Sequence, residues 1–169
     1  PTAKGILGVQ MQSVGEVMAI GRTFRDSLQK AFQSLEVGLS GLDPKITEYR
    51  PLDMSKIRFG TAFRLLKVKQ ALDEGYSITE LYKQTHIDPW FLSQMQHLSI
   101  LGNQNLELTP DILFLFKQEG FSDIQIAEKF NMDESNVFKM RQDHKIFPTF
   151  KSVDTCAAEF LAKTPYCYS

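Results

Sequence analysis

Three histidines and two cysteines are the side chains in this sequence most able to hold a metal ion or act as nucleophiles. His86, His97 and His144 lie far apart and form no His-x-x-x-His or His-x-x-Cys pair, so they lack the spacing of zinc ligands. Cys156 lies in an apolar run, where a thiol is more often buried and inert than reactive. No order of Ser, His, Asp or Cys indicates nucleophilic catalysis. We therefore expect no metal site and no catalytic residue in this chain.

Glycines between residues 5 and 21 raise the question of a phosphate-binding loop. They lack the Gly-Lys-Ser/Thr ending of such a loop, and no Gly-x-Gly-x-x-Gly pattern is present. Glu16 and Arg22 flank an apolar segment and could point into a cleft, although solvated strand edges explain them equally well. The sequence therefore predicts no cofactor-binding residue.

Residues 122–145 have the spacing of a helix-turn-helix, with small Ala127 in the first helix, Asn131 at the turn and Val137 as an anchor of the second. The polar residues of the second helix that could reach bases or phosphates are Asn136, Lys139, Arg141 and Gln142. Acidic residues that would repel phosphate flank them: Asp133, Glu134 and Asp143. Because no basic face is evident, DNA binding is the alternative function rather than the main one, and we expect no nucleic-acid partner.

Bulk composition is that of a globular chain. The 169 residues suffice for one good-sized domain or one domain plus a fragment, 43% of them are hydrophobic, and the net charge is −1. No apolar run approaches the roughly 18 residues that a membrane helix needs, so we expect no membrane partner. The N-terminus lacks the order of a signal peptide and begins without Met, which suggests an excised piece of something longer. Two cysteines suggest no disulfide scaffold, and a reduced, cytoplasmic setting fits best.

Residues 77–146 are expected to form a row of short helices, because each begins with a capping signal. The signals are Ser77 with Glu80, Asp88 with Pro89, Thr109 with Pro110, Ser122 with Gln125, and Asp133 alone. The expected helices of this row are 78–86, 89–102, 110–118, 123–130 and 134–144, and a further helix is expected before it over 61–74. An earlier helix should begin after Thr23 and stop at Gly38. Its apolar stripe consists of Phe24, Leu28, Ala31, Phe32 and Leu35.

The two ends of the chain differ from this helical block. Residues 6–21 combine apolar and β-branched residues with glycine breaks, which predicts two short strands. After Pro148 no helical stripe persists, and Tyr166 and Tyr168 alternate as in a strand. The expected fold class is therefore mainly α: an irregular bundle of short helices, with a short β segment at the N-terminus and an extended C-terminal arm.

The connector at residues 38–60 carries three apolar residues in a polar stretch, Met54, Ile57 and Phe59. One interpretation is that they pack onto neighbouring helices. The other is that they form a small self-association patch, and they are the candidate self-association residues of this chain.

Four motifs resemble the carbamoyl-phosphate synthase large chain. The segment SVGEVMAIGRT at 13–23 looks like the close of that chain's first ATP-grasp half, and VDTCAAEF at 153–160 looks like the join into its second half. Between them, IDPWFL at 87–92 and GFSD at 120–123 resemble patterns of the family's helical domain. The resemblance covers most of 11–38 and 84–169 and is weak across 1–10 and 45–75.

This resemblance implies three parts: residues 1–38 as the tail of the first ATP-grasp (carboxyphosphate) half, 39–150 as the helical oligomerisation domain, and 151–169 as an extended link into the second half. The parent enzyme would make carbamoyl phosphate from bicarbonate, glutamine-derived ammonia and two ATP, for arginine and pyrimidine synthesis. ATP and Mg (or Mn) would bind outside this piece, which is not expected to be catalytic. The implied partners are the adjoining catalytic halves, a small glutaminase chain and further copies of the large chain.

Overall fold

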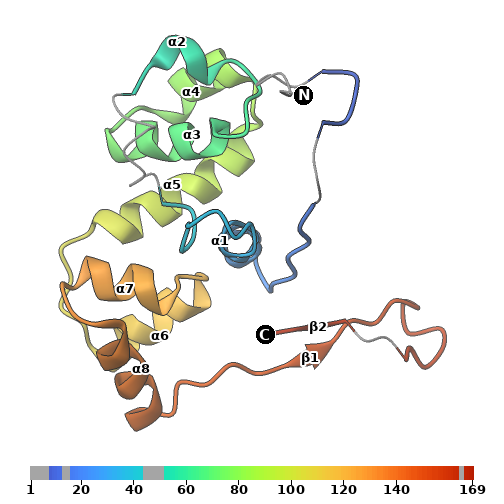
Figure 1. Cartoon of the computed structure of the whole chain (residues 1–169), viewed down its shortest axis with the longest axis vertical. Helices are drawn as coiled ribbons and strands as arrows, with labels where there is room; N and C mark the ends of the chain where they lie inside the picture. The colour runs from blue at the N-terminus through green and yellow to red at the C-terminus, as the bar shows by residue number, and fades with distance from the viewer. Residues whose placement is uncertain (1–7, 13–15, 44–51, 164–165) are drawn as a thin grey trace.

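The computed structural model describes residues 8–12, 16–43, 52–163 and 166–169. These residues form eight helices and one two-stranded sheet, so the described chain is mainly α as expected (Figure 1). The helices are α1 (Phe24–Gln33), α2 (Met54–Ile57), α3 (Arg64–Asp73), α4 (Ile78–Thr85), α5 (Pro89–Asn103), α6 (Pro110–Gln118), α7 (Asp123–Lys129) and α8 (Glu134–Asp143). The strands are β1 (Lys151–Ser152) and β2 (Cys167–Tyr168).

Most helices begin where the capping signals place them. Ser77 and Ser122 each form a complete capping box, and Asp88 and Thr109 each cap a helix that has Pro at its first position. Asp133 is different, because its side chain makes no capping hydrogen bond. α8 begins instead through the main-chain carbonyl of Asp133 and is held by the fully buried Val137.

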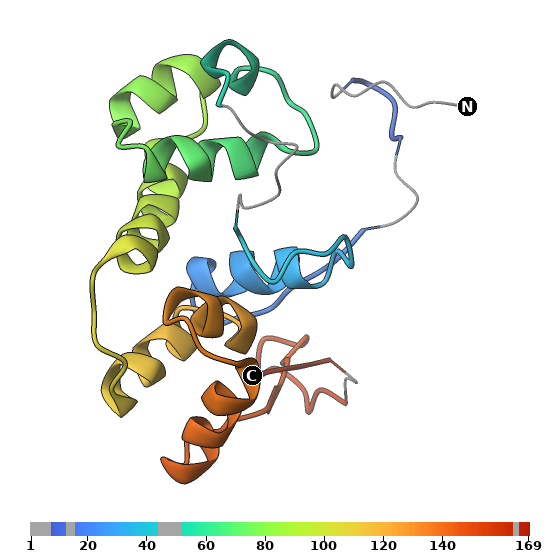
Figure 2. The same ribbon diagram turned by 60° about the vertical axis from the view of Figure 1, so that its left-hand side comes forward.

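The helices form two groups with α1 between them (Figures 1 and 2). α2, α3 and α4 gather around one part of α5, while α6, α7 and α8 form the second group beyond the end of α5. One apolar core runs through both groups and includes Ile57, Leu66, Leu81, Leu98, Leu113, Phe116, Ile126 and Val137. Burial of these side chains is the main driving force that holds the short helices together.

Three expectations about element boundaries need correction. α1 ends at Gln33 rather than at Gly38, α5 continues through Gly102 to Asn103, and the short helix α2 lies in the segment expected to be a connector. A main-chain hydrogen bond from Gln104 to the carbonyl of Ile100 closes the end of α5 beyond that glycine. A single glycine therefore does not end a helix whose neighbours still pack and whose hydrogen bonds continue.

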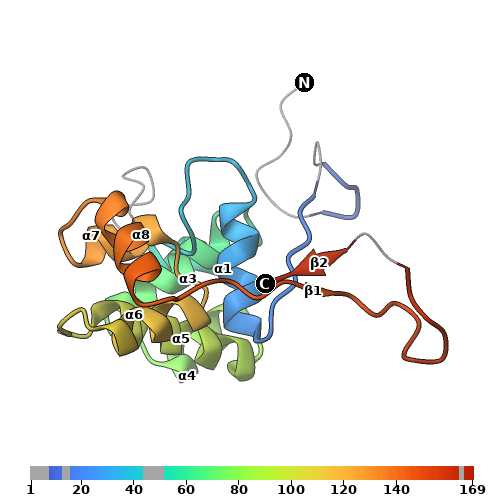
Figure 3. The ribbon, with the colours of Figure 1, turned by 90° about the horizontal axis from the view of Figure 1, so that it is seen from below.

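The short β segment expected at the N-terminus is absent from the described residues 8–12 and 16–21. Val9 and Met11 there are exposed, and a strand needs a paired neighbour to be stable. The rest of the expected strands lies outside the described residues. The small antiparallel sheet is found instead in the C-terminal arm, where Lys151 pairs with Tyr168 and Ser152 with Cys167. Figure 3 shows this arm projecting away from the helices on the side of α1.

Candidate functional site

A set of polar contacts lies at the junction where α1 packs between the two groups of helices (Figure 2). Thr23 caps α1 by accepting a hydrogen bond from the main-chain N–H of Asp26. The Asp26 carboxylate is buried, accepts from the main-chain N–H of Arg22 at 3.1 Å and pairs with Lys30. The start of α1 is therefore held by its own sequence before it contacts any neighbour.

Aromatic rings join α1 to the beginning of α5. The ring of Phe24 lies 5.3 Å from that of Trp90 and 5.2 Å from that of Phe91, with tilted or edge-on geometry. Asp88 fixes this end of α5 by accepting from the main-chain N–H of Trp90 at 2.8 Å, and Leu92 is fully buried. The motif at 87–92 thus begins a helix and gives α1 an aromatic surface to pack on.

Arg25 connects α1 with two further elements at once. Its Nε and Nη2 donate to the two carboxylate oxygens of Glu119, which follows α6, and its Nη1 donates to Gln94 Oε1 on α5 at 2.6 Å. This bidentate pairing raises the pKa of Arg25, mainly through the hydrogen bond to Glu119. His97 Nε2 lies 3.7 Å from the same carboxylate. Arg25 therefore ties together α1, α5 and the end of α6.

Glutamines continue the junction along α1. Gln29 is buried, and its Oε1 accepts from the main-chain N–H of Leu42 at 2.6 Å and from Gln125 Nε2 at 3.5 Å. Gln33 Nε2 donates to the main-chain oxygen of Gly120 at 3.0 Å. Each bond is specific in direction, so α1 has a defined register against its neighbours.

Gly120 permits the close approach of α1 to the second helix group. Its φ is +83°, and a Cβ placed there would lie 2.9 Å from Asp26 Cα and 3.1 Å from Asp26 O. Those are main-chain atoms of α1 that cannot move aside by a rotamer change. Only glycine satisfies both the left-handed conformation and the contact.

Asp123, the last residue of the GFSD motif at 120–123, is the centre of an ion-pair cluster within the second helix group. Its carboxylate accepts from Lys117 Nζ at 2.8 Å and pairs with Arg141 of α8. Burial tends to raise the pKa of Asp123, but Lys117 and Arg141 outweigh it and the pKa is lowered. Lys117 Nζ also donates to the carbonyl of Phe121, and burial lowers the pKa of Lys117. The motif at 120–123 thus supplies a close contact, a cap and an ion-pair centre.

The candidate self-association residues lie on and after α2. Ile57 is fully buried with 0% exposure, and Met54 packs half-buried against the core, so these two contact neighbouring helices. Phe59 is 43% exposed, with the guanidinium of Arg58 5.0 Å from its ring centroid. Of the three, Phe59 offers the most surface to a partner.

The other residues singled out for chemistry remain apart. His86 and His144 cap the C-terminal ends of α4 and α8, while His97 lies on α5. Within the described residues no group of three or more His, Cys, Asp or Glu side chains is placed to hold a metal ion. No helix in the described part of the chain is both long and apolar enough to cross a bilayer. In the α7–α8 pair, Arg141 is bound to Asp123, and nothing in the geometry favours DNA binding.

These features define a mainly helical module in which directional hydrogen bonds join α1 to its neighbours. The chain belongs to the family of the carbamoyl-phosphate synthetase large chain, oligomerisation domain, whose model matches residues 16–145.

Relatives across this family match the whole chain. It is 46% identical to the carbamoyl phosphate synthase large chain of Halomonas eurihalina and 44% identical to that of Archaeoglobus fulgidus, over 16% and 17% of those proteins. It is 43% identical to the N-terminal section of the large chain of Aquifex aeolicus, over 31% of that protein. The chain therefore spans only a small part of the curated relatives that it matches.

Proposed function

We propose that this chain is the rigid connector between the two catalytic halves of a carbamoyl-phosphate synthase large chain. The observation that carries the proposal is the grip on α1, in which Arg25 bonds to both Gln94 and Glu119 while Gly120 lets the main chains touch. In the domain division proposed from sequence, 1–38 belongs to the first half, 39–150 is the connector and 151–169 leads to the second half. α1 would then lie at the boundary of the first half, within the stretch that the family model matches, and be held in fixed register on the rest of the connector.

The proposed parent enzyme forms carbamoyl phosphate from bicarbonate, glutamine-derived ammonia and two ATP, for arginine and pyrimidine synthesis. The names of the relatives support this proposal. ATP and Mg (or Mn) would bind in the catalytic halves, ammonia would come from a small glutaminase chain, and the enzyme would be cytoplasmic. The free thiols of Cys156 and Cys167 agree with a reducing compartment.

The test is an assay of the full large chain with its glutaminase partner and of residues 1–169 alone. We expect the complete enzyme to form carbamoyl phosphate from bicarbonate, glutamine and MgATP, and the isolated piece to show no bicarbonate-dependent ATP hydrolysis. Absence of carbamoyl phosphate formation by the complete enzyme would refute the proposed parent reaction. ATP hydrolysis by the isolated piece would refute the assignment of catalysis to the flanking halves.

We also propose that the large chain self-associates through the surface around Phe59. Phe59→Glu should shift any dimer toward monomer in sedimentation velocity while leaving the midpoint of thermal unfolding nearly unchanged. Ile57→Glu is the contrasting variant, because a charge placed at a fully buried site should unfold the chain rather than merely separate copies. An unchanged dimer with Phe59→Glu would remove this surface as the contact.

A further inference from the structure

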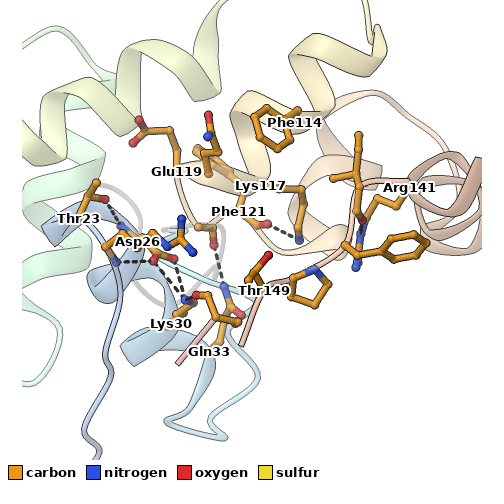
Figure 4. Close-up of a pocket in the computed structure, with 17 residues that line it drawn as sticks. Thr23, Asp26, Lys30, Gln33, Phe114, Lys117, Glu119, Phe121, Arg141 and Thr149 are labelled. Carbon is orange, nitrogen blue, oxygen red and sulfur yellow. Dashed lines mark hydrogen bonds and ion pairs between the residues drawn. The ribbon is translucent and has the colours of Figure 1, made fainter. Parts of the chain in front are cut away.

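A groove lies on the side of α1 that faces the C-terminal arm (Figure 4). Its volume is about 630 Å³, and its walls come from α1, from α6 with the turn after it, from Arg141 of α8 and from residues 146–149. The contacts that hold α1 border this groove. The proposed connector function gives the groove itself no role.

The groove is positively charged relative to the rest of the chain. Its lining cations are Arg22, Lys30, Lys117 and Arg141, and its lining carboxylates are Asp26 and Glu119. Behind them, Arg25 pairs with Glu119, while Asp123 pairs with Lys117 and Arg141. Five cations therefore meet three carboxylates here, whereas the whole chain has 19 basic and 20 acidic residues. This local excess favours an acidic occupant.

The lining is also aromatic. Phe114 is 49% exposed and Phe147 is 61% exposed, and Pro148 lies next to Phe147 in the same wall. Large exposed apolar side chains next to cations suit a polypeptide segment that carries both apolar and acidic residues. Such a segment would cover the rings and at the same time supply carboxylates to the rim.

Part of the C-terminal arm also contributes to the groove. Ser169 itself lines the groove, and its main-chain oxygen accepts a hydrogen bond from Lys30 Nζ. The large chain of Halomonas eurihalina is about six times as long as this chain, since the match covers 16% of its length. We propose that the groove binds an acidic segment of the same large chain, from the part that follows Ser169. This inference rests on the proposed connector function, and it would bring both catalytic halves to α1.

Photo-cross-linking in the complete large chain tests the proposal. The photoreactive residue p-benzoylphenylalanine replaces Phe147, and in a control variant it replaces Phe59 on the other helix group. We expect light to join the residue at 147, and not the one at 59, to an intramolecular peptide beyond Ser169 that contains Asp or Glu. A cross-link at 147 to a second copy, to a peptide before Ser169, or to nothing would overturn the proposal.

Reversing the charge of a cation at the edge of the groove tests the electrostatic part of the proposal. Arg22→Glu should reduce the yield of the cross-link at 147 severalfold, whereas Arg58→Glu on the other helix group should leave it unchanged. An equal yield in both variants would contradict the electrostatic part of the proposal. Carbamoyl phosphate formation by the unsubstituted chain is measured in parallel. Its absence would refute the proposed function, whereas its presence with a misplaced cross-link would refute only this inference.

Discussion

Gly120 and Gly75 have similar left-handed main-chain conformations, with φ of +83° and +92°, but different surroundings. A Cβ at Gly120 would meet the main chain of α1, whereas a Cβ at Gly75 would meet no atom within 4 Å. The pair therefore separates the cost of conformation from the cost of contact. Gly75→Ala should lower the free energy of unfolding by about 1 kcal/mol through conformation alone.

Gly120→Ala should cost more than this, by about 1–3 kcal/mol beyond the value for Gly75→Ala, because α1 must shift or the loop must strain. Chemical unfolding of the two variants measures the difference. Equal losses at the two sites would show that the contact between Gly120 and Asp26 contributes nothing to stability.

Asp123 gives the chain an acid-sensitive centre. Its pKa is lowered from 3.8 by Lys117 and Arg141, so the folded form binds a proton less readily than the unfolded form. Its contribution to stability is thus complete well above pH 3.8 and is lost as the pH falls through the lower, folded pKa.

Asp123→Asn should lower the free energy of unfolding at pH 7 by about 1–3 kcal/mol, because it leaves two cations without their carboxylate. The loss should shrink as the pH falls below 3.8, because the unfolded carboxyl then takes up a proton more readily than the ion-paired native carboxyl does. Urea unfolding at pH 7 and near pH 3 measures both values, and Glu107→Gln serves as an exposed carboxylate control. A loss that stays constant with pH would contradict the ion-pair explanation.

At the scale of elements, the sequence predicts helices much better than it predicts the faces of those helices. Capping residues and proline act locally, so α4, α5, α6 and α7 begin where Ser77, Asp88, Thr109 and Ser122 predict. Strands depend on partners elsewhere in the chain, and the expected N-terminal pair is not formed in the described residues. Local sequence signals therefore predict where these helices begin, but they do not predict which strands will pair.

The residues of α1 show why its junction with the two helix groups could not be predicted from the sequence. Its expected apolar stripe is confirmed at Phe32, which is buried, but it also included Leu35, which is exposed. The other buried positions of the helix are the polar residues Asp26 and Gln29. Polar residues that bond to other elements look like solvent-facing residues until those elements are placed. The motifs at 87–92 and 120–123 were the available signal, since both contact α1.

Arg25→Ala should loosen α1 specifically. It removes the bonds to Glu119 and Gln94 and leaves a mostly buried carboxylate without its main partner, at a cost of about 1–3 kcal/mol. Hydrogen exchange at the α1 amides should accelerate more than exchange in α3. Arg25→Lys should restore little, because an ammonium cannot make the bidentate pair. Full rescue by lysine would show that charge alone is enough.

At the scale of the whole molecule, two ties among the described residues help the shared core to hold the helix groups together. One is α1. The other is Lys129 of α7, whose Nζ donates to the main-chain oxygens of Gly102 and Gln104 at 2.8 and 2.7 Å, at the end of α5. Both ties use directional bonds, so they fix an orientation that apolar burial alone leaves free. A connector needs this property if it is to hold two catalytic halves at one spacing.

In the proposed enzyme, Gly120→Ala should weaken the coupling between the two catalytic halves rather than stop the chemistry in either half. In the complete large chain, Gly120→Ala should shift α1 against its neighbours and so change the spacing of the two halves. The proposed ATP sites lie outside this region and should remain intact. We expect bicarbonate-dependent ATP hydrolysis to persist and the carbamoyl phosphate formed per ATP consumed to fall below one for every two. Parallel product and ADP assays measure this ratio, with Gly75→Ala as the control at a left-handed glycine where an added Cβ would meet no atom within 4 Å. An unchanged ratio in a folded Gly120→Ala enzyme would mean that the grip on α1 stabilises the module without setting the register of the halves.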